Sequence, residues 1–299
     1  MQKDKPFPYL AGYIDGDGSF VLNVSKRERR RKISPVKCTD YLCQISICGK
    51  QIKCLNFIKE NFGGSIYKHK KIIENQAQLF LYRKNVPNDG FLKNILPFLI
   101  EKKDQCLTCM NFKEFEPCKR NQLVKLIKIQ RGQNPAYENF PKEMNLLKNT
   151  IEPSETDYQY MSGFIDAECC ICINKRKAHG KYLCFRPYIR CGNTKYPVIK
   201  WMMERFGGNV FFLEKGRYNL HSSILDLHIS GKNLEEILKR TLPHLVHKSE
   251  QAKEVLRLID ISRKRKGSLA KDFYSWRDSI LLLKNDIYHK VKALNQKGV

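Results

Sequence analysis

The chain of 299 residues is long enough for two domains, each with a hydrophobic core of its own. Apolar residues make up 42% of it, which excludes an intrinsically disordered chain. Its 55 basic and 30 acidic residues give a formal charge of +25, which favours a polyanionic partner, and nucleic acid is the default choice.

No apolar stretch approaches the roughly 20 residues needed to span a bilayer, so we expect no membrane association. The segment MQKDKPFPYL lacks the apolar core of a secretory signal, which predicts a protein that is not secreted. Usage rich in lysine, isoleucine and asparagine indicates an AT-rich organellar genome, chloroplast or mitochondrial. The 12 cysteines then lie in a reducing compartment, and we expect them in the core. Cys106 and Cys109 form a lone CxxC, which predicts buried helix residues and not a zinc site.

The first elements form a helix followed by a hairpin. Residues 8–17 predict a short helix. After it, Phe20 and Leu22 alternate with polar neighbours, and this period of two indicates a strand with one buried face. A basic turn at 26–32, KRERRRK, leads to a return strand near 38–48.

A second helix and hairpin follow. Residues 50–61 carry apolar side chains on one stripe, and the pair Gly63–Gly64 ends the predicted helix. Residues 65–69 and 78–82 predict the hairpin, and residues 94–111 predict one continuous helix.

The chain then repeats itself. PYLAGYIDGDGSF at 8–20 resembles QYMSGFIDAECCI at 159–171. Two further landmarks return in the same order, NFGGSIY (61–67) as RFGGNVF (205–211) and ILPFLIEKKDQ (95–105) as TLPHLVHKSEQ (241–251). Chance similarity does not preserve order in this way, so the repeat predicts two copies of one domain.

The repeat sets the expected domain boundaries. We expect an N-terminal domain at 1–130 and a C-terminal domain at 158–299. Between them, the segment 131–157 holds Gly132 and several prolines among polar residues and predicts a linker. The tail at 268–299 has apolar side chains at helical spacing, which predicts a packing helix.

The motifs LAGYIDGDG at 10–18 and MSGFIDAEC at 161–169 carry a resemblance to a known family. On them the chain resembles the LAGLIDADG homing endonucleases, in the type that has both motifs in one polypeptide, and the FGG and LP landmarks extend the likeness over nearly the whole chain. The second motif departs from the pattern at Ser162, Glu168 and Cys169. The resemblance implies an α+β fold of two tandem αββαββα homing-endonuclease-like domains. These would form a saddle of two antiparallel sheets, with the motif helices at the domain interface.

Gly12 and Gly163 lie in the middle of the two motif helices, where glycine costs about 1 kcal/mol relative to alanine. Close approach of the two helices would offset this cost, because small residues let the axes come nearer than the usual ~8–10 Å. Asp17 and Glu168 would then meet at two negative helix ends, where their carboxylates repel each other. Divalent cations with oxygen ligands relieve this repulsion, so we expect two or three Mg²⁺ ions at the domain interface.

Asp15 and Asp166 precede these acids by two residues, and we expect them to bond the backbone within their own copies. A further position, polar in many members of the family, corresponds to Ile47 and Cys191.

The LP landmark matches Lys102 with Lys248, and the resemblance implies active-site lysines that stabilise developing negative charge. A pair of solvated helix lysines is the alternative interpretation. Counting back from the Gly-Gly pairs adds Gln51 and Lys195 as further catalytic candidates.

The reaction follows from these groups. Mg²⁺ polarises scissile phosphates and lowers the pKa of bound water. The resemblance implies a site-specific, monomeric endonuclease of intron homing that hydrolyses one phosphodiester on each strand of a long asymmetric double-stranded DNA and leaves short 3′ overhangs.

Strand ribbons fit the major groove of DNA, where Asn and Gln suit adenine and Arg suits guanine. We expect the strand faces turned away from the cores to present DNA-binding side chains. These are Asn23, Ser25, Arg27, Gln44, Lys68 and Lys70 in the first copy, and Asn174, Arg176, Arg186, Tyr188 and Arg190 in the second.

Three other functions compete with DNA cleavage. A maturase that binds group I intron RNA needs the basic surface but not the two acids, and one chain could serve both roles. A DNA-binding regulator needs neither the acids nor the lysines. A ribosomal or structural RNA-binding protein does not need the paired motifs. Asp17 and Glu168 favour cleavage.

Overall fold

The computed structural model describes residues 6–30, 35–68, 76–84, 89–112, 117–178, 182–216, 221–263 and 273–297. The chain divides into two compact units, Met1–Pro135 (unit 1) and Ala136–Val299 (unit 2). Among the described helices, none is long and apolar enough to cross a membrane.

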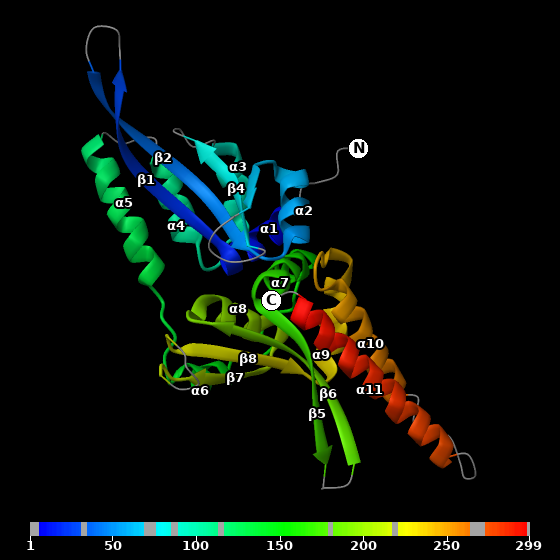
Figure 1. Ribbon diagram of the computed structural model, residues 1–299. Helices are drawn as coiled ribbons and strands as arrows, with labels where there is room; N and C mark the ends of the chain where they lie inside the picture. The colour runs from blue at the N-terminus through cyan, green and yellow to red at the C-terminus, as the bar shows by residue number, and fades with distance from the viewer. Residues whose placement is uncertain are drawn as a thin grey trace. The chain divides into compact units, whose positions relative to one another are not determined.

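Unit 1 follows the predicted order of helix, hairpin, helix, hairpin and helices (Figure 1). Its elements are α1 (Phe7–Asp17), β1 (Gly18–Arg30), β2 (Pro35–Gly49), α2 (Ile52–Phe62), β3 (Ser65–Lys68), β4 (Ala77–Lys84), α3 (Asp89–Ile95), η1 (Leu96–Phe98), α4 (Lys103–Asn111) and α5 (Pro117–Gly132).

Unit 2 repeats this order after one short additional helix (Figure 1). Its elements are α6 (Phe140–Met144), α7 (Glu155–Glu168), β5 (Cys169–Ala178), β6 (Tyr182–Asn193), α8 (Tyr196–Phe206), β7 (Asn209–Leu213), β8 (Ile224–Ser230), α9 (Lys232–Thr241), η3 (Leu242–His244), α10 (Ser249–Arg263) and α11 (Phe273–Lys297).

The two sheets have the same topology. The strand orders are β1-β2-β4-β3 and β5-β6-β8-β7, and all neighbouring strands are antiparallel. Phe20 pairs with Ile45 on the buried face of the first sheet, and Ile171 pairs with Ile189 on that of the second. All four side chains are fully buried, and burial of such a side chain contributes about 1.5–3 kcal/mol. The predicted fold class is therefore confirmed in each unit.

A helix closes the outer edge of each sheet. In unit 1, Arg131 of α5 donates from its guanidinium to the carbonyl oxygen of Phe20 on β1. In unit 2, Asn295 of α11 donates to the carbonyl oxygen of Ile171 on β5 at 2.9 Å. Phe20 and Ile171 are equivalent in the repeat, so both units satisfy the same backbone group of an edge strand, which would otherwise invite pairing with another chain. The packing helix predicted for the tail is confirmed as α11.

The prediction of one continuous helix over 94–111 is wrong. The α3 helix ends at Ile95, a 3-10 turn follows, and Leu99 is extended (φ −72°, ψ 135°) before α4 begins at Lys103. Pro97 lies in the turn and cannot donate the hydrogen bond that a continuous helix needs. The break leaves the backbone N–H groups of residues 100–102 outside both helices, and they donate to the side chain of Asp15.

The segment 131–157, expected as a linker, is partly helical. It includes α6, whose Phe140 and Met144 are buried and whose neighbours are β7 and α8 of unit 2. Of the prolines that suggested a linker here, Pro135 and Pro153 flank α6, whereas Pro141 lies in its first turn.

The cysteines only partly follow the prediction. Cys106 and Cys109 are fully buried in α4, as predicted. Cys48 and Cys170, however, are exposed, because they lie on the strand faces turned away from the helices. Cys169 and Cys191 form a disulfide between β5 and β6, a pairing that the sequence did not indicate.

Candidate active site

The acids of the two motifs lie at equivalent helix ends. Asp17 is the last residue of α1 and Glu168 is the last residue of α7, and each is followed at once by the first strand of its unit. The next backbone N–H, of Gly18 or Cys169, closes the last turn on the carbonyl of Ile14 or Ile165. Asp17 is half-buried and Glu168 is exposed. A carboxylate at the negative end of a helix is destabilised unless a cation lies near it.

A carboxylate buried in α1 holds the broken helix segment of unit 1. Asp15 is 1% exposed and accepts from the backbone N–H groups of Ile100 (2.8 Å), Glu101 (3.2 Å) and Lys102 (3.0 Å). These three residues connect the 3-10 turn to α4, and Lys102 is the N-cap of that helix. In return, Nζ of Lys102 donates to backbone carbonyls at the end of α1.

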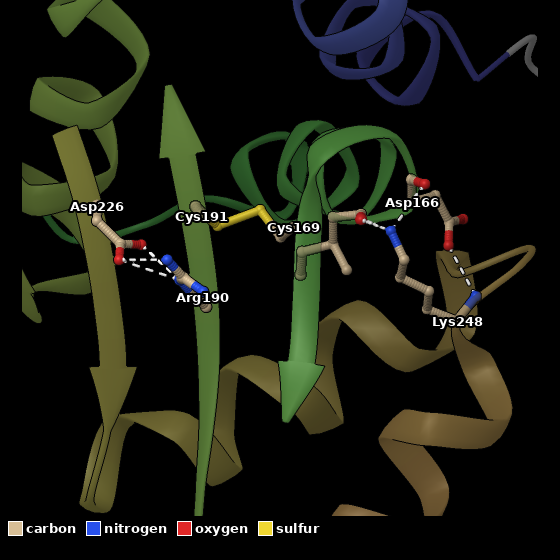
Figure 2. The surroundings of a disulfide bond; sticks show 7 residues. Asp166, Cys169, Arg190, Cys191, Asp226 and Lys248 are labelled. Carbon is tan, nitrogen blue, oxygen red and sulfur yellow. Dashed lines mark hydrogen bonds and ion pairs between the residues drawn. A yellow bond between two sulfur atoms is a disulfide. The ribbon is translucent and has the colours of Figure 1, made fainter. Parts of the chain in front are cut away.

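Unit 2 contains the same arrangement (Figure 2). Asp166 is fully buried and accepts from the backbone N–H groups of Val246, His247 and Lys248 at 2.7, 3.2 and 2.8 Å. Nζ of Lys248 donates to the carbonyls of Ile165 and Asp166 at 2.6 and 3.0 Å. We call each such pair of residues, Asp15 with Lys102 and Asp166 with Lys248, a carboxylate–lysine clamp. The expectation that the two aspartates bond backbone within their own copies is confirmed.

The other candidate near Asp17 is Gln51, at the start of α2. Its Oε1 accepts from the hydroxyl of Tyr13 at 3.0 Å. A Cβ atom at Gly49 would lie 3.8 Å from Oδ2 of Asp17 and 3.9 Å from the backbone nitrogen of Gln51, so the two residues flank the end of β2. Burial raises the pKa of Cys48, and the carboxylate of Asp17 raises it further.

The surroundings of Glu168 carry more positive charge. A hydrogen bond with Cys172 lowers the pKa of the Cys170 thiol to about 6, and the charges of Lys248 and Arg190 lower it too, whereas Glu168 raises it. Glu168, Lys248 and Arg190 are therefore neighbours of one exposed position on β5. Lys195, the counterpart of Gln51, is half-buried at the start of α8, where its backbone N–H donates to Asn193 at 3.0 Å.

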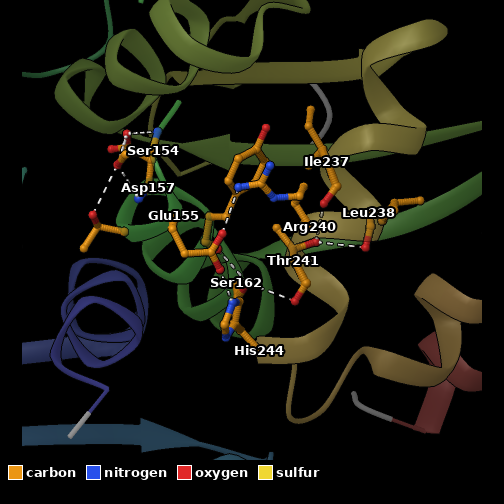
Figure 3. Close-up of polar contacts among 11 residues, drawn as sticks. Ser154, Glu155, Asp157, Ser162, Ile237, Leu238, Arg240, Thr241 and His244 are labelled. Carbon is orange, nitrogen blue, oxygen red and sulfur yellow. Dashed lines mark hydrogen bonds and ion pairs between the residues drawn. The ribbon is translucent and has the colours of Figure 1, made fainter. Parts of the chain in front are cut away.

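The N-terminal end of α7 is anchored on the α9–η3 corner (Figure 3). Ser154 and Asp157 form a capping box, which contributes about 0.5–2 kcal/mol to a helix. Glu155 bonds Arg240 at 2.9 Å and His244 at 2.8 Å. The second motif helix is thus fixed at both ends within its own unit.

The outer face of the second sheet carries the DNA-binding residues that were predicted for the second copy. The register pairs Asn174 with Arg186 and Cys172 with Tyr188 on one face. Asn174, Arg176, Arg186 and Arg190 are exposed, and Tyr188 is half-buried. Asn174, Arg176, Arg186 and Tyr188 border a groove of about 810 Å³ that Phe211 and His228 also line, and the C-terminal end of α10 lies along it.

Sequence reasoning missed Asp226, His228 and Phe211 on this face. Asp226 is 4% exposed and accepts two hydrogen bonds from Arg190 (Figure 2). The rings of His228 and Phe211 lie 5.2 Å apart. The alternation along β8 could have indicated Asp226 and His228, but the sequence does not show which strand they pair with.

Among the side chains that the structure describes, the outer face of the first sheet carries fewer charges. Asn23 is exposed there as predicted, whereas Gln44 shares its face but is 8% exposed. Lys68 is exposed and alternates with Tyr67, which is 52% exposed and contacts Phe80 at 5.3 Å. The side chains of Ser25 and Arg27, and residue Lys70 as a whole, lie outside the described part of the structure.

The residues at the helix ends fit Mg²⁺, which keeps several waters and is held by one or two carboxylates together with substrate phosphates. In the described ranges, no three His, Cys, Asp or Glu side chains gather as a metal site. The packing of Gly12 on Gly163, and a shared site at Asp17 and Glu168, stay predictions.

Comparisons with known proteins agree with the motif. Residues 10–101 match the family described as LAGLIDADG endonuclease. The intron-encoded DNA endonuclease aI3 of Saccharomyces cerevisiae is 33% identical over 66 residues, which are 19% of this chain and 16% of that protein. The chain thus covers only a small part of that relative's length.

Solved structures resemble nearly the whole chain. The meganuclease I-SmaMI, bound to uncleaveable DNA, has a TM-score of 0.61 at 17% identity, over 95% of this chain and 99% of that one. The LAGLIDADG homing endonuclease I-GzeII, in complex with a DNA target, has a TM-score of 0.57 at 14% identity, over 93% and 96%. At these identities the likeness shows the fold alone, which is the two-domain fold of I-SmaMI.

Proposed function

Because residues 10–101 match the LAGLIDADG endonuclease family and nearly the whole chain has the fold of I-SmaMI, we propose that the protein is a site-specific DNA endonuclease. It cuts both strands of a long, asymmetric target and leaves short 3′ overhangs. The observation that carries this proposal is the duplicated helix end. Asp17 and Glu168 are the last residues of α1 and α7, and each helix end is held by an equivalent carboxylate–lysine clamp.

In this proposal Asp17 and Glu168 would hold Mg²⁺ ions, and these ions would supply charge neutralisation at the scissile phosphates. Each acid serves one strand. Gln51 and Lys195 occupy equivalent positions, at the starts of α2 and α8, and in this proposal they orient groups at the two scissile phosphates. Lys102 and Lys248 either keep the acids in place or contact the phosphates.

The two sheets present the side chains that read the target. The faces differ at nearly every equivalent position, for example Ser46 in unit 1 and Arg190 in unit 2, as the strand registers define them. A palindromic site would not match two such faces. We therefore propose one long asymmetric site, read by a monomer, with Arg186 and Arg190 of unit 2 favouring guanine and Asn23 and Asn174 favouring adenine.

The experiment uses a plasmid that carries the uninterrupted sequence flanking the gene's insertion point. Wild-type protein with Mg²⁺ should convert it to linear DNA, and Asp17→Asn should abolish that conversion while leaving binding to the same DNA within about twofold, because phosphate contacts dominate affinity. Cleavage by Asp17→Asn at the wild-type rate would contradict the proposal. The alternative of an RNA maturase is supported instead if Asp17→Asn promotes splicing of the host intron while wild-type protein leaves the plasmid intact.

A further inference from the structure

Lys102 uses its charged amine at the end of α1. An ammonium group has three N–H donors, and three carbonyls of the last turn accept from it: Ile14 at 2.7 Å, Asp15 at 2.7 Å and Gly16 at 3.3 Å. The carbonyls of Asp15 and Gly16 lie in the last turn of the helix, where carbonyls lack a partner within the helix, whereas Ile14 also accepts from the N–H of Gly18. With the side chain 9% exposed, these bonds account for the burial of its charge.

Lys248 does the same at the end of α7, although the two units differ in most other polar residues. Its amine is bonded to Ile165 and Asp166, and the side chain is 8% exposed. In both units the lysine and the backbone N–H that closes the helix share one carbonyl, of Ile14 in α1 and of Ile165 in α7. The lysine thus bonds the last turn directly before the metal-binding acid.

The aspartate completes the connection from the other side. Asp15 and Asp166 hold the backbone of the very lysine that bonds the helix, at 3.0 and 2.8 Å. Neither part can move without the other: a shift of the helix end breaks the lysine bonds, and a shift of the lysine segment breaks the aspartate bonds. The pair therefore fixes the direction in which the helix end presents its last side chain.

We propose that Lys102 and Lys248 are positioning residues, which act through the backbone of the helix end and so aim Asp17 and Glu168, with Asp15 and Asp166 as their partners. This inference rests on the proposed function, since it assigns the acids to the metal ions. It replaces the expectation that the lysines touch the scissile phosphate or the attacking water.

The two roles predict opposite changes in metal affinity. A lysine cation beside bound ions repels them, so its removal from a direct role would tighten ion binding. A positioning lysine keeps the carboxylate oriented, so its removal weakens ion binding. The sign of the change therefore separates the roles without any measurement of cleavage.

Two measurements on Lys102→Met and Lys248→Met test the proposal. The first is hydrogen exchange of the Gly18 and Cys169 amides in the full-length protein without DNA. Each variant should raise exchange in its own unit, on the order of tenfold, because the shared carbonyl loses a donor and the turn opens more often. The second is titration of Ca²⁺ into the complex with target DNA, where affinity should fall several-fold.

The neighbouring exposed lysines, Lys103 and Lys253, supply matched controls, and their Met variants should behave as wild type in both measurements. Asp15→Asn keeps the amine but weakens the other half of the clamp, so it should also raise Gly18 exchange if Lys102→Met fails to fold. Exchange equal to that of the controls, or tighter Ca²⁺ binding, overturns the proposal. Absence of cleavage by wild type would count against the nuclease function alone, since the exchange measurement needs neither DNA nor activity.

Discussion

Arg190 on β6 and Asp226 on β8 form a two-pronged ion pair across the outer face of the second sheet. Nε of Arg190 donates to both carboxylate oxygens, at 2.9 and 3.0 Å. The arginine side chain is 50% exposed and the aspartate 6%, so a buried anion fixes the direction of an accessible cation. The hydrogen bonds with Asp226 also raise the pKa of Arg190 above its usual value. His228 lies 3.2 Å from the same carboxylate.

Removal of this anchor should relax target specificity. In Asp226→Ala the guanidinium loses its fixed direction, so discrimination at the base pair that it reads should fall by about 1–3 kcal/mol. Relative cleavage rates on targets with single base-pair changes measure this loss. Glu214→Ala removes an exposed acid from the same unit and serves as the control. An unchanged preference at every base pair in Asp226→Ala would show that Arg190 reads no base.

The disulfide between Cys169 and Cys191 should stabilise unit 2. The two cysteines are 22 residues apart, and closure of such a loop reduces unfolded-state entropy by about 3 kcal/mol. Reductant should therefore lower the melting temperature of unit 2 by roughly 6–12 °C. The double variant Cys169→Ala/Cys191→Ala should melt at this lower temperature with or without reductant. Equal melting of oxidised and reduced wild type would show that the bond contributes no stability.

Glu155 gives a pH dependence at the start of α7. Its pKa is lowered, first by the hydrogen bond with His244 and then by that with Arg240. A carboxyl whose pKa is depressed in the folded state adds stability above its unfolded pKa of about 4.3 and loses it as the pH falls through the folded pKa. Since Glu155 is exposed, Glu155→Gln should lower the free energy of unfolding at pH 7 by less than about 1 kcal/mol.

Urea denaturation of wild type and Glu155→Gln at neutral and acidic pH measures this contribution. The difference between the two proteins should shrink as the pH falls below about 4 and through the lowered pKa of the folded state, because the carboxyl is then protonated in both states. A difference of the same size at both pH values would mean that Glu155 acts through packing and not through its charge.

The sequence predicted the fold because the fold is repeated. The motif around Asp17 returns around Glu168, and strand alternation at Phe20 and Leu22 locates a buried face without any knowledge of partners. These signals are local, so they survive in a single sequence. The helices α1 and α7 end at Asp17 and Glu168, at equivalent positions of the two motifs.

The features that were missed depend on contacts far apart in the chain. The break before Lys103 is stabilised by Asp15, more than 80 residues away, so helical spacing alone favoured a continuous helix. The Cys169–Cys191 bond requires the register of β5 on β6. Asp226 gains its role only when β8 pairs with β6 beside Arg190. The spacing of residues along one segment does not indicate which distant residue that segment will contact.

The central claim is that Asp17 and Glu168 jointly hold divalent ions over the target. Anomalous diffraction from crystals of the protein with its DNA and Mn²⁺ tests it most directly. We predict manganese peaks within about 2.0–2.2 Å of carboxylate oxygens from both residues and beside the scissile phosphates. Peaks that avoid both carboxylates, or acids that lie apart from each other and from the DNA, would contradict the claim.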